Sequence, residues 1–143
     1  MIKIKISVKC DYALRAMLEL ALEYGVQTSN IHEVARRQGI PKRYLEHLLL
    51  TLKRSGLVVS FRGKEGGYKL AKKPKLIKLG DIIRAIEGDL DITPKVKAVL
   101  KKGTISDVWL SIQGAVVGVL DSITLEDLVN KKRLSEKTLT YYI

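Results

Sequence analysis

Basic side chains and glycines gather in the segment FRGKEGGYKLAKK, at positions 61–73. It holds five lysines or arginines, a single acid, Glu65, and three glycines. Glycine lets a backbone turn tightly and approach another surface without side-chain clash. Cations at such a turn can pair with phosphates, and an arginine can enter a minor groove, where A·T tracts concentrate negative potential. A plain surface hairpin does not explain this lysine density. We therefore predict nucleic-acid contacts at Arg62, Gly63, Lys64, Gly66 and Gly67.

A second set of polar residues lies opposite the leucines of KRYLEHLLLTLKRS, which we expect to be a helix. A helix in the major groove presents its N-terminal residues to base edges, and Arg43 can donate two hydrogen bonds to guanine. Phosphates repel a carboxylate, so we expect Glu46 to accept from a cytosine amino group or to reject wrong bases. An ordinary solvated helix face explains the same charges when this helix is taken alone. The candidate contacts are Lys42, Arg43, Tyr44, Glu46 and His47.

Five elements are predicted to position these residues. Helices are expected over 12–24, over 30–38, where Asn30 and Glu33 form a capping-box pattern, and from 42 onward. The third helix buries Leu45, Leu48, Leu49 and Leu52, which recur at helical spacing. A short turn with Gly39 and Pro41 joins the second and third helices, as in a helix-turn-helix. Two strands, LVVSFR and GYKLA, then form a hairpin around a five-residue loop. The order is that of a winged helix.

The second half of the chain is predicted to be helical. We expect a helix over 79–88, a loop over 89–103, a long helix over 104–121 and a short helix over 124–130, capped by Thr124 with Asp127, before a polar tail. The long helix carries an apolar stripe that needs a partner surface. We predict that it forms a dimer interface through Val108, Trp109, Ile112, Ala115, Val116, Val119 and Leu120. The fold class is mainly α with a small β-hairpin wing, divided into a winged-helix domain, 1–78, and a helical dimerisation region, 79–143.

Charge is distributed unevenly between these two parts. Residues 1–78 carry 17 Lys or Arg and 6 Asp or Glu, a net charge of +11, whereas residues 79–143 carry 9 of each. A lysine-rich surface that only aids solubility would spread over the whole chain. The asymmetry indicates a polyanionic partner for the first part. The chain contains no run of eighteen apolar residues, so we predict no membrane span. A single cysteine fits a reducing compartment. We expect a cytoplasmic protein without a membrane partner.

Several motifs together give the chain a resemblance to a known family. SVKCDYALRAML, EVARRQGIPKRYLEHLL, LVVSFRGKEGGYKLA, LGDIIRAIEG and LDSITLEDLV occur in order. This combination resembles the Rrf-two family of bacterial transcription regulators, the IscR, NsrR and CymR type. The resemblance implies a homodimer that represses or activates at a pseudo-palindromic promoter site, and of the two we predict repression. It also implies a small-molecule effector or a partner enzyme. By position it places base contacts at Arg43, Glu46 and His47, the minor-groove arginine at Arg62, and backbone contacts near Ser7, Lys9 and Tyr12.

Three departures from the family pattern concern cofactors and charge. Many members hold an iron–sulfur cluster with three cysteines in the loop before the dimer helix, but DLDITPKVKAVLKKG contains none. Clusters usually need four ligands, mostly thiolates, so Cys10 cannot hold one even when paired with its copy. Asp11 stands where some cluster-binding relatives have an acidic ligand and others a basic residue, and we interpret it as a coincidence or a relic. Glu65 lowers the charge of the wing. We therefore expect no cofactor and no metal site.

Other function classes are weaker. The sequence shows no nucleophile–base pair, phosphate loop or paired carboxylates in a pocket-like context, so we do not expect an enzyme. The main alternative is a winged-helix scaffold that docks to a protein or RNA, with DNA binding secondary. The main hypothesis is a homodimeric, sequence-specific regulator that binds double-stranded DNA.

Overall fold

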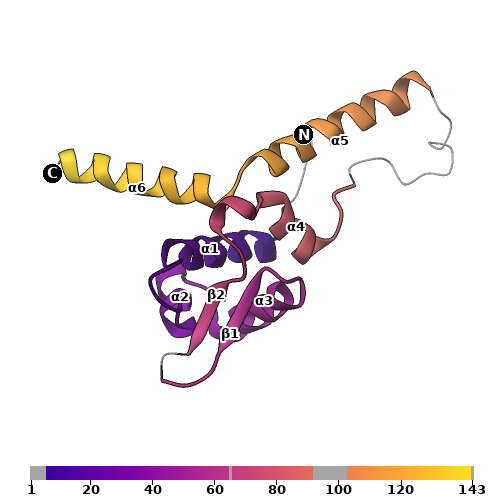
Figure 1. The fold of residues 1–143 in the computed structure, drawn as a ribbon. Helices are drawn as coiled ribbons and strands as arrows, with labels where there is room; N and C mark the ends of the chain where they lie inside the picture. The colour runs from indigo at the N-terminus through magenta and orange to yellow at the C-terminus, as the bar shows by residue number, and fades with distance from the viewer. Residues whose placement is uncertain (1–5, 65, 92–102, 143) are drawn as a thin grey trace.

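Three helices form the body of the molecule (Figure 1). The computed structural model describes residues 6–64, 66–91 and 103–142. The helices are α1, Val8–Leu22, α2, Ile31–Gln38, and α3, Lys42–Arg54, and each contacts the other two. Helix α1 begins earlier than predicted because Ser7 caps it, its Oγ accepting a hydrogen bond from the Cys10 amide at 3.3 Å. The Asn30 side chain likewise caps α2, by accepting from the His32 amide at 2.8 Å.

The leucines of α3 anchor the hydrophobic core. Leu45, Leu48, Leu49 and Leu52 are all buried, which confirms the predicted buried stripe. Three of them, at 45, 49 and 52, belong to one buried cluster with residues of α1 that include Ala13, Met17 and Leu20. The polar face of α3 is therefore turned outward, and the packing fixes which residues it offers to a partner.

A hairpin follows the three helices and leads away from them. Strand β1, Val58–Phe61, pairs antiparallel with β2, Gly67–Leu70, and the connection between them is five residues long, as predicted. Ser29 extends this sheet as a third, single-residue partner. Its amide donates to the Tyr68 carbonyl at 2.8 Å, and its carbonyl accepts from the Tyr68 amide at 2.9 Å. These two bonds fix strand β2, one residue from the turn, to the segment just before α2.

The remaining helices include one that is longer than expected. They are a single 3-10 turn, η1, Pro74–Leu76, then α4, Leu79–Glu87, α5, Thr104–Ser122, and α6, Leu125–Tyr142. The prediction that the last helix ends at 130 was wrong. The predicted cap is present, with the Thr124 amide donating to Asp127 Oδ2 at 2.9 Å and the Asp127 amide donating to Thr124 Oγ1 at 3.2 Å. The polar stretch that follows has no glycine or proline to end the helix, and it is rich in residues that favour helix.

Residues on both sides of position 78 share one core. Ile77, Ile82, Leu125 and Val129 belong to the same buried cluster as three leucines of α3, at 45, 49 and 52. Helix α4 and the start of α6 therefore pack on the winged helix, while α5 extends away from the body (Figure 1). The hairpin tip lies on the opposite side of the body from α5 and α6. The described helices include none long and apolar enough to cross a membrane.

Candidate nucleic-acid interface

The outer face of α3 presents exposed polar side chains near its N-terminus. Arg43 and His47 are exposed, and neither side chain makes a hydrogen bond or ion pair with the residues that the structure describes. Glu46 lies one turn beyond Lys42, with Lys42 Nζ 3.7 Å from Glu46 Oε1. This cation offsets the carboxylate, which gives Glu46 a local role besides the predicted selection among bases.

Two tyrosines predicted to contact DNA pack against each other. The rings of Tyr12 in α1 and Tyr44 in α3 meet edge to face, with centroids 5.7 Å apart and planes at 83°. Both are half-buried and pack against the core. Edge-to-face aromatic pairs add about 0.5–1.5 kcal/mol beyond the area they bury. These tyrosines therefore help to hold the start of α3 against α1. Their contact with DNA stays a prediction.

The start of α1 is tied to α4 rather than left free. The Ser7 hydroxyl accepts from the Cys10 amide and contacts the Glu87 carboxylate, to which it donates. Asp11 pairs with Arg15 one turn along, with Arg15 Nε 2.8 Å from Asp11 Oδ2. Lys9 is exposed. Of the three residues predicted to lie near the DNA backbone here, Lys9 is therefore the cation available to a phosphate.

Glycine is required at two places in the hairpin. A side chain at Gly66 would place its Cβ 2.7 Å from the Phe61 carbonyl oxygen and 2.8 Å from that of Gly63, so only glycine fits inside the turn. Gly67 lies so close to Ser29 that a Cβ would overlap the Ser29 carbonyl, and its φ of +156° disfavours other residues. Arg62, Gly63 and Lys64 stand exposed at the tip.

Other cations of this region are already engaged. Lys53 Nζ donates to Ser60 Oγ at 2.7 Å and joins α3 to β1. Lys69 Nζ lies 5.1 Å from the centroid of the Phe61 ring, within cation–π range. These two lysines stabilise the hairpin on its two opposite faces, because the side chains of the consecutive residues Ser60 and Phe61 point to opposite sides of β1. Arg62 and Lys64 lie beyond them, where a groove of DNA would be reached first.

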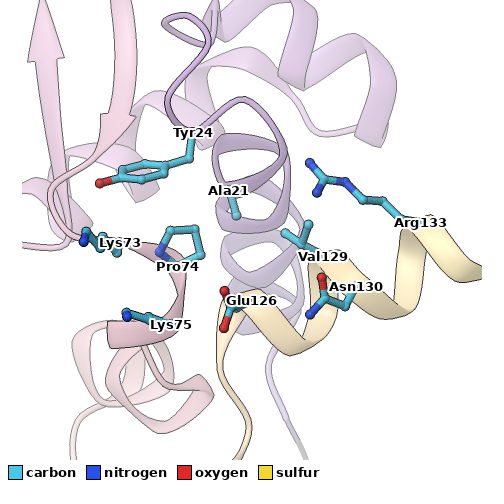
Figure 2. A pocket seen from close by; sticks show the side chains of 9 residues that line it. All are labelled: Ala21, Tyr24, Lys73, Pro74, Lys75, Glu126, Val129, Asn130 and Arg133. Atoms are coloured by element: carbon cyan, nitrogen blue, oxygen red, sulfur yellow. The ribbon is translucent and has the colours of Figure 1, made fainter.

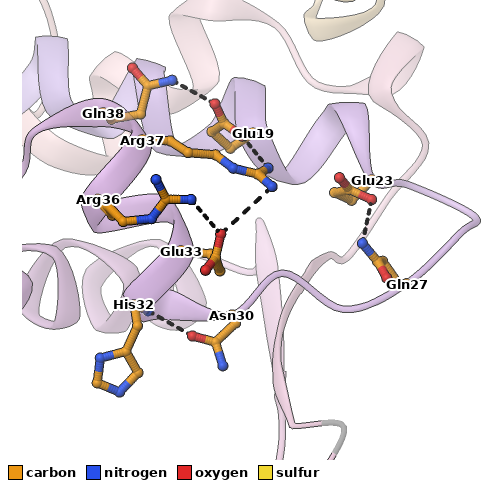
Figure 3. A network of polar contacts seen from close by, with 9 residues as sticks. All are labelled: Glu19, Glu23, Gln27, Asn30, His32, Glu33, Arg36, Arg37 and Gln38. Carbon is orange, nitrogen blue, oxygen red and sulfur yellow. Dashed lines mark hydrogen bonds and ion pairs between the residues drawn. The ribbon is translucent and has the colours of Figure 1, made fainter.

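Acidic residues of the first half are offset locally (Figure 3). In α2, Arg36 lies 3.0 Å and Arg37 3.7 Å from the Glu33 carboxylate, and Arg37 also lies 3.6 Å from Glu19. Glu19 is buried in α1 and accepts from Gln38 Nε2 at 2.6 Å. The predicted capping-box acid, Glu33, thus pairs with arginines. The positive charge left over lies on α3, on the hairpin and on the lysines at 72, 73, 75 and 78 that follow it.

The donor set does not fit an iron–sulfur cluster. Cys10 is the one cysteine of the chain and is 1% exposed. Its pKa is raised by burial and, next, by the nearby Glu87 carboxylate, so the thiol keeps its proton, whereas a cluster needs thiolates. Within the described residues, no three His, Cys, Asp or Glu side chains are grouped to hold a metal ion.

One face of α5 lacks a covering surface within the described chain. Ile105 is 68% exposed and Val119 58%, and Val108, Trp109, Ile112 and Ala115 are exposed between them. Val116 and Leu120 are half-buried, and Leu120 lies on the side of α5 that faces α4. The predicted interface residues therefore form one long apolar strip, of which only one edge is covered.

Two features escaped prediction from the sequence. Arg84 of α4 binds Asp121 of α5, with Nη2 2.5 Å from Oδ1, and lowers the pKa of that carboxyl group. A pocket also lies between α1, η1 and α6, and it includes Asn130 and Arg133. The polar residues at 126, 130 and 133 have the spacing of one helix face. The predicted helix ended at 130, so position 133 was not placed on that face.

Together, a helix-turn-helix with an exposed basic face, a basic hairpin and an attached helical extension define a winged-helix DNA-binding protein. Comparison with known proteins gives the family. A family model described as Rrf2, iron-dependent transcriptional regulator, matches residues 6–131, and the chain belongs to this family. It is a DNA-binding transcription regulator, since its relatives are named as such and not as enzymes.

Relatives match over nearly the whole chain. The regulator CymR of Bacillus subtilis is 38% identical over 139 residues, which cover 97% of this chain and 99% of CymR. A solved structure of CymR, the global cysteine regulator of that organism, aligns with a TM-score of 0.83 over 90% of this chain and 98% of CymR. The structure of IscR from T. potens, 39% identical, aligns with a TM-score of 0.76 over 90% and 88% of the two chains. These matches confirm the predicted winged-helix fold.

Proposed function

We propose that this protein is a homodimeric repressor that binds a pseudo-palindromic site in double-stranded DNA and works without an iron–sulfur cluster. The observation that carries the proposal is the placement of its unpaired cations. Acids such as Glu19, Glu33 and Glu46 each have a local cation, whereas Arg43, Arg62 and Lys64 stand exposed without a partner among the described residues. Such a surface attracts a polyanion.

The two exposed regions have different roles in this proposal. Arg43 and His47, near the N-terminus of α3, read base edges in the major groove, because bidentate contacts discriminate between bases by about 1–3 kcal/mol. Arg62 at the hairpin tip enters the flanking minor groove. Lys9 and Lys64 pair with phosphates and set the register of the protein on the duplex.

Dimerisation places two such modules on one site. The apolar strip of α5 would be covered by the same strip of a second copy, since a twofold interface uses one surface twice. A repeated half-site in the DNA then follows from the symmetry of the protein. Because the target is chromosomal DNA, the protein would act in the cytoplasm of a bacterium.

The signal would not be read through iron. Buried, protonated Cys10 offers no thiolate, and the chain has no second cysteine. The regulator would therefore respond to a small-molecule effector or to a partner enzyme, as the family resemblance implies.

A salt series on DNA binding tests the proposal. The dissociation constant of the full chain would be measured for a duplex from its own promoter and for a random duplex, at several salt concentrations. Each neutralised phosphate contributes a slope of about −0.9 to log K against log salt, so we expect a steep fall in affinity. We also expect tighter binding to the promoter duplex at every salt concentration. A flat series, or equal binding to both duplexes, would instead favour a scaffold that docks to protein or RNA.

A further inference from the structure

A pocket beside the C-terminal end of α1 is not used by the proposed DNA interface. It holds about 350 Å³ and lies between α1, η1 and α6 (Figure 2). Ligand sites for small molecules span about 300–1,000 Å³, so this one suits a single small metabolite rather than a nucleotide. The lining residues are Ala21, Tyr24, Lys73, Pro74, Lys75, Glu126, Val129, Asn130 and Arg133.

Side chains of opposite charge line this pocket but form no ion pair with each other among the described residues. Glu126, Asn130 and Arg133 follow one another along α6 at i, i+4 and i+7, and so share one helix face. Seven residues of helix rise about 10.5 Å, which keeps Glu126 and Arg133 apart. None of the three makes a side-chain hydrogen bond or ion pair within the part of the chain that the structure describes. Figure 2 shows the Arg133 side chain extending from α6 toward α1, with the Glu126 carboxylate beside Pro74.

Four of the other lining residues are apolar or aromatic, and the remaining two are Lys73 and Lys75. Ala21 and Val129 are buried at the floor, and Pro74 and the ring of Tyr24 form a wall. A ligand that fits must therefore carry a negative group, a positive group and a compact apolar body. An anion alone would leave Glu126 opposed to it, and a cation alone would face Arg133, Lys73 and Lys75.

We propose that this pocket binds one free α-amino acid with an apolar side chain. Arg133 pairs with its carboxylate through two parallel hydrogen bonds, the geometry that a guanidinium favours. Glu126 pairs with its ammonium group, and Asn130 bonds to either. The ligand side chain packs on Val129 and Pro74.

Binding here would influence the DNA-binding arrangement, and this part rests on the proposed function. The pocket walls come from α1, from the segment that follows the hairpin, and from α6. Only Ile123 and Thr124 separate α6 from α5, the proposed dimer helix. A ligand that touches all three walls favours the arrangement in which α6 is seated on η1, and so biases the placement of the two modules.

Calorimetry on the full chain tests the site, with each of the standard amino acids as the probe. For the best binder, the matching amine without a carboxylate and the matching acid without an ammonium group are then titrated. We expect each analogue to bind at least tenfold more weakly. Arg133→Gln and Glu126→Gln should weaken binding similarly, while Lys131→Gln, a neutralised cation elsewhere on the exposed surface of α6, should not.

Several results would overturn the inference. No saturable binding of any amino acid at millimolar concentration would remove the ligand class, and equal binding of the acid analogue would reduce the site to a simple anion site. Binding unaffected by Arg133→Gln would place it elsewhere. The bound amino acid should also change DNA affinity about fivefold or more, and an unchanged affinity would remove the regulatory role. DNA binding by the ligand-free protein is measured separately, so failure here leaves the proposed function standing.

Discussion

At the residue scale, the surroundings of each cation decide which ones are available to DNA. Arg36 and Arg37 neutralise acids, Lys53 bonds to Ser60 and Lys69 covers Phe61. These cations stabilise the fold. Replacing them would weaken DNA binding only indirectly, through a loss of stability. Arg62 is exposed in the loop that follows β1.

Replacing Arg62 with alanine should weaken binding to the promoter duplex about tenfold, or ~1.4 kcal/mol. The loss should be greatest where A·T-rich sequence flanks the site, because a narrow minor groove concentrates negative potential. Fluorescence anisotropy with matched A·T-rich and G·C-rich flanks measures both effects.

Lys137→Ala is the matched control for Arg62→Ala, since it removes an exposed cation from α6, away from the hairpin. It should leave the dissociation constant nearly unchanged. Equal affinities for wild type and Arg62→Ala would remove the hairpin from the mechanism.

At the element scale, the position of the hairpin depends on the attachment of β2 to the body. Two backbone hydrogen bonds between Ser29 and Tyr68 supply that attachment, and they require the chain at Gly67 to pass close to Ser29. Gly67→Ala should therefore lower the free energy of unfolding by about 1–3 kcal/mol. Urea denaturation of the variant measures this loss.

Gly63→Ala provides the comparison within the same hairpin. Its φ of +106° is also unfavourable for alanine, but a Cβ there meets nothing within 4 Å. The difference between the two variants thus isolates the overlap with Ser29. If both lose the same stability, the attachment of the hairpin to Ser29 contributes nothing.

A second attachment, between α4 and α5, should respond to pH. Hydrogen bonding to Arg84 holds the pKa of Asp121 below its usual range. The contribution of the pair to stability is therefore complete above the ordinary carboxyl pKa, and it is lost as pH falls through the lower folded-state pKa. Asp121→Asn should be less stable than wild type at neutral pH, with a thermal midpoint that converges on the wild-type value in acid.

The pair is partly exposed to solvent, so the expected shift is small. Asp107→Asn, on the same helix outside the Arg84 contact, should show no such convergence. If the difference in thermal midpoint between Asp121→Asn and wild type does not change with pH, Arg84 and Asp121 do not stabilise the contact between α4 and α5.

Local patterns of sequence were enough to predict most elements, and the exceptions have physical causes. The leucine spacing of α3, the turn glycines of the hairpin and the Thr124–Asp127 cap each depend on neighbours in the chain. The end of α6 was predicted wrongly although the local sequence favours a longer helix, since the stretch after 130 contains no glycine or proline. The Arg84–Asp121 pair joins positions 37 residues apart, and no local pattern marks it.

At the scale of the whole molecule, the proposed DNA contacts and the proposed dimer contacts lie on opposite sides of the body. The cations that we propose for DNA contact belong to α1, α3 and the hairpin, while α5 and α6 extend on the other side of the body (Figure 1). Helix α4 and the start of α6 share the core of the body, so a change in the placement of α5 would be transmitted to the hairpin through packed residues. This arrangement suits a protein in which dimer geometry sets the spacing of two DNA contacts.

The proposed dimer gives the last prediction. Replacing both Ile112 and Val116 with aspartate should produce monomers, because burying unpaired carboxylates in an apolar interface costs several kcal/mol. Analytical ultracentrifugation would show the change in mass, and promoter affinity should fall with it because one half-site alone remains. Val116 is half-buried against the rest of its own chain, so a variant at Ile112 and Val119, both exposed, separates loss of the dimer from loss of folding. Ser135→Asp with Thr138→Asp adds the same two charges on exposed positions of α6 and should sediment as the wild type does. Dimers that persist in both α5 variants would place the interface on another surface, and the two DNA-binding modules would then need a different symmetry.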